Sequence, residues 1–509
     1  MTPRETELSL LLEQCQAALA LSLRENQLLR EKVNLLVRRV FGSSSEKLDA
    51  AQLQLLLEAN QSIAPAPAQA AELPQAQTPV TRPQRKARVP RLPDNLPVIE
   101  VVIDPEPVKA QPEQWRCIGQ EVSEQLDYEP GRFLRRRVVR RKYVHRSELD
   151  RAPIVAPLPP TLQERCIATA ALLAYILVSK YCDHLPLYRL EQIFQRRHSV
   201  NLPRQTLARW VELAADWLKP IYEHIQTGVM AGGYVQLDET PINYLEPGAG
   251  RALQGYLWTG SRPGGDVFFQ WHTSRAATCL DTIVPVDFTG TVQCDGYAAY
   301  RAFAKGRVKP IKLAGCWAHV RRKFHEASQT APRTAGWILR HIQNLYRIES
   351  QLREGHAGPA LRAAVRASQS RLIVQRLKRA LERLQARKRF LPQSSMGVAI
   401  EYSLAQMPGL EVYLEDGRIE IDNNLVENAI RPTALGKKNW LFFGEAGAGE
   451  RSAILYTVIE SCRRRGLDPY AYLKDVLSRL PQMTNRQIPE IAPQAWGKPA
   501  QKPLQRMAS

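Results

Sequence analysis

A change of hydrophobic period near residue 232 limits the folds open to this chain more than any other feature. Residues 162–225 repeat their apolar side chains at helical spacing, and residues 316–390 return to a helical and basic pattern. Between them, short apolar segments predict strands at 234–237, 255–258, 267–271 and 291–294, with a helix at 274–282. The sequence therefore predicts a multidomain protein of the α+β or α/β class that contains a sheet.

The N-terminal segment carries a heptad pattern. Over residues 8–40, leucine and valine recur at alternating spacings of four and three, and Asn26 shares the seam position of Val33 and Val40. Valine and leucine seams with one asparagine are typical of parallel dimeric coiled coils. One long amphipathic helix that packs on its own protein is the alternative interpretation.

The segment before the helical region is basic. Residues 60–97 are rich in alanine, proline and glutamine, which indicates a flexible linker. Residues 98–158 are typical of short strands and turns, with arginines crowded between Arg132 and Arg146. Two interpretations are open: a strand or arm that lies along phosphates, or a solvated sheet edge.

Residues 185–218 predict a pair of helices. Leu185–Arg196 is amphipathic, a turn follows at 198–202, and Pro203 opens a second helix through Leu218. Helix, short turn and helix resemble a helix-turn-helix, and an ordinary helical hairpin is the alternative. The second helix begins with residue types that contact base edges and phosphates in a major groove, namely Arg204, Gln205, Thr206 and Arg209.

The composition points to a polyanionic partner. The net charge is +20, from 70 lysines and arginines against 50 acidic residues, and nucleic acid is the simplest partner for such a surface. The eight cysteines include no Cys-x-x-Cys pair, so neither a disulfide framework nor a zinc ribbon is indicated and a reducing cytosol fits. The most apolar stretch, 167–178, is shorter than the roughly 20 residues that a membrane helix needs.

Three acidic residues are candidates for a metal site. Asp238 and Asp295 follow predicted strands and Glu427 begins a short helix, so the fold can bring three carboxylates together. Such a set suits hard divalent cations, Mg²⁺ or Mn²⁺, and two ions about 4 Å apart support phosphodiester chemistry. Each acid also has a structural explanation: a strand-ending turn, an Asp-Gly turn, and a capping box from Asn424. Glu239, Asp266 and Asp287 compete with them, and spacing alone does not choose.

Specific motifs along the chain resemble those of one protein family. They are Val37–Leu48, Glu121–Tyr128, Leu177–Arg189, Asp238–Pro241, Gln293–Tyr297, Gly315–Phe324, Asp416–Asn424, Glu427–Pro432 and Leu435–Gly444. On these motifs, which span roughly residues 37–480 in register, the chain resembles transposases of the insertion sequence 66 family.

The resemblance implies an RNase H-like, retroviral-integrase-like core with an Asp-Asp-Glu triad at Asp238, Asp295 and Glu427. It implies a DNA transposase that binds the terminal inverted repeats of a mobile element and catalyses metal-dependent strand cleavage and strand transfer. Two small accessory proteins of the same element are implied as partners, and the heptad helix favours a homodimer or larger assembly. We expect a bacterial cytoplasmic protein, associated with the nucleoid when DNA is bound, and no membrane partner.

Further residues are candidates for DNA contacts. Arg431 lies one helical turn after Glu427, and Pro432 is expected to end that helix, which leaves Lys437 and Lys438 in a loop. Arg321, Arg322 and Lys323 form a basic cluster beside Cys316-x-x-His319. That Cys-x-x-His spacing suits a metal, but a pair is not a site. Many family members carry paired cysteines around the segment matching 121–143, whereas only Cys117 is present here, so no structural zinc is predicted.

The predicted organisation follows the order of these features. It comprises a heptad helix at 1–48, a linker at 49–97, a degenerate zinc-finger-like β-rich module at 98–158, a helical DNA-binding domain at 159–228, a catalytic core at 229–312 and 392–448, a helical insertion at 313–391, and a C-terminal helical segment with a loose tail at 449–509. Three rival functions stay open: a nuclease without strand transfer, a non-catalytic DNA-binding repressor, and a zinc hydrolase that uses Cys316 and His319.

Overall fold

The computed structural model describes residues 131–138, 142–143, 154–155 and 160–497, together with Gln16 and Ser22. The described residues from 142 onward belong to one compact unit, and residues 131–138 belong to another. The predicted coiled coil, the linker and most of the 98–158 module lie outside the described residues. Within that module, β1 (Lys142–Tyr143) pairs in antiparallel fashion with β2 (Ile154–Val155).

Three helices precede the large sheet. They are α4 (Ala170–Tyr181), α5 (Leu187–His198) and α6 (Arg204–Met230). Ser199 adopts left-handed backbone angles and ends α5, and the Glu191 carboxylate accepts the backbone N–H of Arg204 where α6 begins. The helix does not end at Leu218 as predicted. It continues past Pro220 because Ile221, Ile225 and Val229 are buried on one face, and this packing outweighs the lost hydrogen bond.

The sheet is open and mixed. Its members are β3 (Tyr234–Leu245), β4 (Ala252–Ser261), β5 (Val267–His272), β6 (Gly290–Gln293) and β7 (Ile311–Ala314), in the order β5-β4-β3-β6-β7. β3, β4 and β5 form an antiparallel meander, whereas β6 and β7 run parallel to β3. The short β8 (Phe442–Phe443) pairs with the far end of β3. The sequence did not predict β7 or β8.

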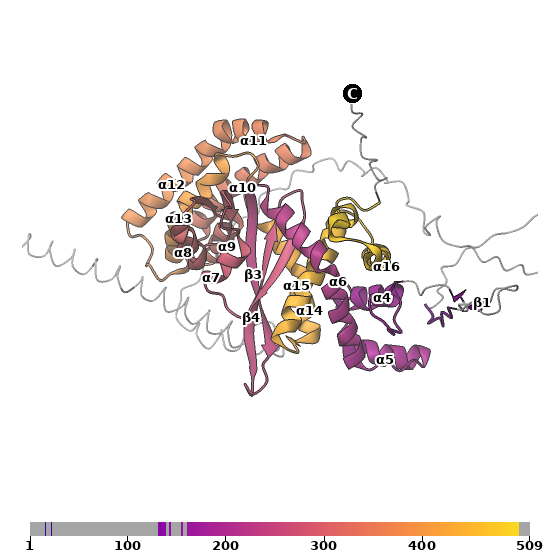
Figure 1. Cartoon of the computed structure of the whole chain (residues 1–509). Helices are drawn as coiled ribbons and strands as arrows, with labels where there is room; N and C mark the ends of the chain where they lie inside the picture. Colours follow the sequence, from indigo (N-terminus) through magenta and orange to yellow (C-terminus); the bar gives the residue numbers. More distant parts are fainter. Residues whose placement is uncertain are drawn as a thin grey trace, which may run out of the picture. The chain divides into compact units, whose positions relative to one another are not determined.

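Helices connect the parallel strands and follow them. α7 (Thr278–Ile283) precedes β6, and α8 (Ala298–Gly306) joins β6 to β7. After β7 come α9 (Trp317–Ala327), α10 (Pro332–Glu354), α11 (Pro359–Val365), the π-helix η2 (Arg366–Ser370), α12 (Arg371–Ala386), α13 (Ser395–Glu411) and the 3₁₀ turn η3 (Val412–Leu414). In Figure 1, α10 to α13 lie on one side of the β3–β4 hairpin, while α6 and α15 lie on the other. One apolar core runs through α9, α10, α12 and α13.

The chain closes with further helices. These are α14 (Asn424–Trp440), α15 (Ala446–Arg464), α16 (Pro469–Arg479), η4 (Leu480–Gln482), η5 (Asn485–Gln487) and α17 (Ile488–Ile491). The sequence predicted that the C-terminal segment ends in a loose tail, and this prediction is wrong for the part of the tail that the structure describes, up to residue 497. Ile488 and Ile491 are buried, and the Trp496 indole N–H donates to the Asp475 carboxylate at 2.9 Å. Among residues 160–497, no helix is both long and apolar enough to cross a membrane.

Candidate active site

Two aspartates lie at the same level beside the carboxyl end of β6. Gln236 of β3 pairs with Gln293 of the parallel strand β6. Asp238 and Asp295 each follow this pair by two residues, so neighbouring strands bring both to one edge. The sequence predicted that the strand ends just before Asp238, and this prediction is wrong. β3 continues to Leu245 because residues 238–245 keep their pairing with β4.

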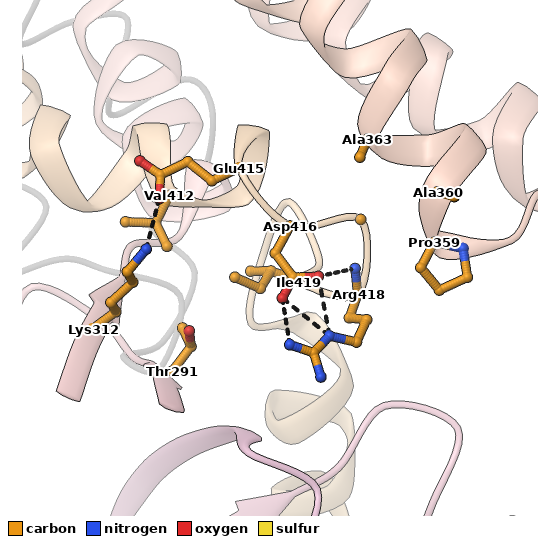
Figure 2. A pocket seen from close by; sticks show the side chains of 11 residues that line it. Thr291, Lys312, Pro359, Ala360, Ala363, Val412, Glu415, Asp416, Arg418 and Ile419 are labelled. Carbon is orange, nitrogen blue, oxygen red and sulfur yellow. Dashed lines mark hydrogen bonds and ion pairs between the residues drawn. The ribbon is translucent and has the colours of Figure 1, made fainter. Parts of the chain in front are cut away.

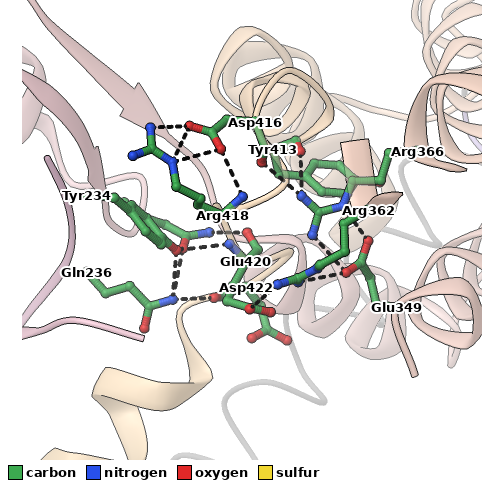
Figure 3. Close-up of polar contacts among 11 residues, drawn as sticks. Tyr234, Gln236, Glu349, Arg362, Arg366, Tyr413, Asp416, Arg418, Glu420 and Asp422 are labelled. Carbon is green, nitrogen blue, oxygen red and sulfur yellow. Dashed lines mark hydrogen bonds and ion pairs between the residues drawn. The ribbon is translucent and has the colours of Figure 1, made fainter. Parts of the chain in front are cut away.

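A pair of buried glutamines fixes the segment that leads to Glu427. The Gln236 amide donates to the Gln293 side-chain oxygen and to the Asp422 carbonyl, both at 2.9 Å. Gln293 donates to the Glu420 carbonyl, also at 2.9 Å. Figure 3 shows Gln236 and Tyr234 reaching the segment at Glu420 and Asp422. These bonds hold residues 420–422 against the strands that carry the two aspartates.

The start of α14 is anchored beside Asp238. The Asn423 amide donates to the Leu237 carbonyl at 3.0 Å, and the Asp422 carboxylate accepts the backbone N–H of Asn424 at 3.1 Å. The predicted capping box is therefore wrong: Asn424 is already helical, and Asp422 satisfies the free N–H group. Glu427 falls in the first turn of this helix, and its charge helps to raise the pKa of Asp238.

Asp238 is half-buried near other acidic side chains. Burial, followed by the charges of Glu239, Asp295 and Glu427, raises the pKa of Asp238 to about 8. Without a counter-charge, Asp238 therefore holds its proton over much of the neutral range. A divalent cation would favour the ionised carboxylate, so the oxygen donors fit the Mg²⁺ or Mn²⁺ that the sequence predicts.

Two of the three competing acids have arginine partners. Glu239 accepts hydrogen bonds from Arg275 Nε and the Tyr300 hydroxyl, both at 2.7 Å. Asp266 forms an ion pair with Arg465 at 2.7 Å, and Asp287 is exposed. Asp266 is therefore tied to Arg465, whereas Glu239, although bonded to Arg275 and Tyr300, still lies near enough to Asp238 to raise its pKa.

Glu427 also belongs to a second group of side chains. Ligand atoms of Cys316, His319 and Glu427 all lie within 4.8 Å of one another, the one such trio of His, Cys, Asp or Glu residues among those described. His319 Nε2 is 3.8 Å from Glu427 Oε1. Burial raises the pKa of the Cys316 thiol to about 12, which argues against a free thiolate nucleophile.

Several of the predicted basic residues surround Glu427. An Arg322 guanidinium nitrogen lies 3.8 Å from Glu427 Oε2, and Arg431 lines the same hollow as Glu427. Pro432 does not end α14, since the buried residues Ile430 and Thr433 on either side keep the helix packed. Lys437 and Lys438 therefore lie in the helix and not in a loop.

Lys437 differs from the other candidates for DNA contacts. Its ammonium group donates to the Thr240 hydroxyl at 3.2 Å and to the Pro241 carbonyl at 3.0 Å, which ties α14 to β3. Lys438, Arg321 and Arg322 are exposed, and Lys323 is half-buried. At the start of α6, Arg204, Gln205 and Arg209 are exposed and Thr206 is half-buried.

A different hollow, of about 420 Å³, lies by the loop 415–419. Figure 2 shows that its charged groups are already paired. Lys312 contacts Glu415 at 2.9 Å, and Arg418 contacts Asp416 at 2.6 Å. With no charge left to bind an anion or a cation, this hollow is a weaker candidate site than the three carboxylates.

Three family models match parts of this chain. The family described as Transposase IS66 matches residues 165–451, a second described as Transposase C of IS166 homeodomain matches residues 28–101, and the IS66 C-terminal element matches residues 457–494.

Two relatives come from Sinorhizobium fredii (strain NBRC 101917 / NGR234). The uncharacterized protein y4jD is 35% identical over 423 residues, which cover 80% of this chain and 81% of the relative. The uncharacterized protein y4qI is 37% identical over 405 residues, which cover 76% of this chain and 73% of the relative. On the length of these matches, the chain belongs to the IS66 family of transposases.

Proposed function

We propose that this protein is a DNA transposase whose Asp238, Asp295 and Glu427 form an Asp-Asp-Glu metal site. The observation that carries the proposal is the equal offset of the two aspartates from one strand pair, with Glu427 close enough to raise the pKa of Asp238. The strand order and directions support an RNase H-like core, with β3–β5 as the antiparallel meander and β6 and β7 as the parallel strands.

The three carboxylates would hold two Mg²⁺ or Mn²⁺ ions. The chemistry that such ions supply when bound is activation of a water or a 3′-hydroxyl and stabilisation of the departing oxygen. Asp238 and Asp295 hold their ligand positions through backbone N–H groups of Glu239 and Tyr297, at 3.0 and 2.9 Å. In the described part of the chain, ligand oxygens of Asp238, Asp295 and Glu427 do not all lie within 4.8 Å of one another, so these side chains would close around the ions on binding.

The surrounding basic residues would position DNA. Arg322, Arg431 and Lys438 would contact phosphates beside the cleavage site, and the start of α6 would read the terminal inverted repeats. The helix pair α5–α6 supports this assignment because the base-reading side chains at its second helix are largely exposed. The heptad segment would pair protomers so that two element ends are held together.

Cleavage and strand transfer by single variants test the proposal. Asp238→Asn, Asp295→Asn and Glu427→Gln should each lower the rate of end cleavage by about 100-fold or more, since each removes a charge from the metal site. Asp287→Asn, an exposed acid, is the matched control and should keep full activity. Circular dichroism would verify that all four variants fold.

The same assay separates the rival functions. Pre-cut ends should be joined to a target duplex by the wild-type protein in Mg²⁺. Cleavage without joined product would indicate a nuclease. DNA binding with neither reaction, unchanged by the three substitutions, would indicate a repressor and would overturn the proposal.

A further inference from the structure

We propose that Cys316, His319 and Glu427 form a binding site for a borderline-soft divalent cation, with Zn²⁺ as the natural occupant. The site is distinct in its donors from the three-carboxylate site, and only Glu427 is common to both. Its evidence is geometric, and it does not depend on the proposed function.

The fold brings the three ligands together from two helix starts. Cys316 is the N-cap of α9 and His319 lies in the first turn, so the Cys-x-x-His spacing places both at one end of one helix. Glu427 enters from the first turn of α14. The local sequence motif shows only Cys316 and His319. The third ligand, Glu427, lies 108 residues beyond His319 (427 − 319).

The distances suit a metal with little rearrangement. All three ligand atoms lie within 4.8 Å of one another, and His319 Nε2 is 3.8 Å from Glu427 Oε1. Tetrahedral zinc with bonds of about 2.0–2.3 Å holds its ligand atoms roughly 3.3–3.8 Å apart. Shifts of about 1 Å in side chains would therefore close the site around an ion.

Two polar atoms of the site lack a hydrogen-bond partner. Glu427 Oε1 and His319 Nδ1 are buried without a hydrogen-bond partner in the described part of the chain. Buried polar atoms normally have a partner, so an unpaired carboxylate oxygen facing a thiol and an imidazole calls for a ligand. The three protein ligands leave a fourth position for water, a substrate or another group.

The donor set selects the class of metal. Sulfur and imidazole donors favour Zn²⁺ over Mg²⁺, which prefers oxygen donors only. The backbone N–H of Asn423 donates to Cys316 Sγ at 3.3 Å, and this contact would support the thiolate that forms when the thiol releases its proton to solvent on binding. Asn423 also bonds to Leu237, so this supporting contact is itself anchored to the sheet.

Sharing Glu427 has a consequence for catalysis. A zinc ion bound to Cys316 and His319 would draw the Glu427 carboxylate away from Asp238 and Asp295. Zinc would then inhibit a reaction that Mg²⁺ supports. This consequence, unlike the site itself, rests on the proposed function.

Cobalt substitution in the full-length protein tests the site. One equivalent of Co²⁺ should produce a thiolate-to-cobalt charge-transfer band together with the visible bands of a tetrahedral ion. Cys316→Ser should abolish the charge-transfer band, and His319→Ala and Glu427→Gln should each alter or abolish the tetrahedral spectrum. Cys279→Ser and His325→Ala, a buried cysteine elsewhere and an exposed histidine on α9, are the matched controls and should keep both.

The wild-type spectrum is decisive even if a variant fails to fold. Absence of a thiolate band at one equivalent, or a band that survives Cys316→Ser, would overturn the site in favour of a direct contact between His319 and Glu427 without a metal. A tetrahedral spectrum unchanged by Glu427→Gln would overturn the three-residue assignment.

Cleavage assays address the consequence separately. Zinc added to a Mg²⁺-supported reaction should slow the wild-type protein, and the ratio of rates with and without zinc should return toward one in Cys316→Ser. If no cleavage occurs under any condition, the proposed function fails, while the cobalt spectrum still decides the metal site.

Discussion

At the scale of single residues, a buried arginine joins the helices after β7 to the segment that precedes α14. Arg366 is fully buried, and its Nε donates to the Glu349 carboxylate at 2.7 Å. The same guanidinium donates to the Tyr413 and Asp416 carbonyls at 2.8 and 3.0 Å, as Figure 3 shows. Arg362 extends the network from Glu349 to Glu420, at 3.1 and 2.9 Å. This network supports the chain that positions Glu427.

Removing Arg366 should destabilise the protein strongly. Arg366→Met leaves Glu349 buried with one cationic partner and removes one donor each from the Tyr413 and Asp416 carbonyls, so the free energy of unfolding should fall by about 3 kcal/mol. Arg371→Met, the same substitution at an exposed position five residues later, should change it by less than about 0.5 kcal/mol. Urea unfolding measures both. If both substitutions lowered the free energy of unfolding equally, the buried network would contribute no more than an exposed arginine.

The network also predicts a pH dependence. Burial by itself raises the pKa of Glu349, but Arg366 and Arg362 outweigh it and hold the pKa below its ordinary value. A lowered folded-state pKa means that the stabilisation is present above the unfolded value of about 4.3 and is lost as the pH falls through the folded value. The stability difference between wild type and Arg366→Met should therefore narrow below about pH 4. If this stability difference instead grew as the pH fell, the pKa of Glu349 would not be lowered in the folded protein.

At the scale of elements, α15 packs closely on β5 through a glycine. A Cβ built at Gly449 would lie 2.4 Å from the Trp271 ring, whereas one at Gly447 would meet only the flexible Arg451 side chain at 3.3 Å. The Thr457 hydroxyl accepts the backbone N–H of Phe269 at 2.8 Å, which holds the helix against the strand. The close approach of α15 to β5 therefore requires glycine at position 449 but not at position 447.

Paired substitutions measure this packing. Gly449→Ala should lower the free energy of unfolding by about 1–3 kcal/mol because the added methyl group overpacks the interface. Gly447→Ala, in the same helix, should be neutral or raise it by up to about 1 kcal/mol, since alanine favours helix. Thermal and urea unfolding of the two variants give the comparison. A harmless Gly449→Ala would mean that Trp271 can move aside.

At two prolines, tertiary packing outweighs the local preference for a helix end. Pro220 and Pro432 both predict helix ends, yet α6 and α14 pass through them. A proline costs about 3 kcal/mol inside a helix. Burial of the apolar residues on either side offsets that cost. Such burial depends on partners far away in the sequence, so the element boundaries could not be read from local signals.

At the scale of the whole molecule, the net charge predicts how the proposed binding of DNA should depend on salt. A chain with net charge +20 that contacts 6–10 phosphates should lose about 10³–10⁵ in affinity between 50 and 200 mM salt. Fluorescence anisotropy with duplexes across a salt series measures the slope. Arg431→Ala should reduce that slope by about one unit, whereas Arg371→Ala, away from the candidate site, should leave it unchanged. A flat salt dependence would argue against phosphate contacts.

The sequence by itself determined the sheet with its flanking helices, the basic character of the chain, and three candidate acids. One signal for the site went unused: Gln236-Leu-Asp238 and Gln293-Cys-Asp295 share a glutamine two residues before the acid, on strands that turn out to pair. A strand places residues two apart on one face, so the glutamines below the acids could have been anticipated.

Only the tertiary structure decided which partners the individual acids have. It gave Glu239 and Asp266 arginine partners, and it placed Glu427 beside Cys316 and His319. The physical reason is the same in each case. Hydrogen bonds, ion pairs and metal ligation act over a few ångströms, and segments separated by more than a hundred residues come that close only when the core packs.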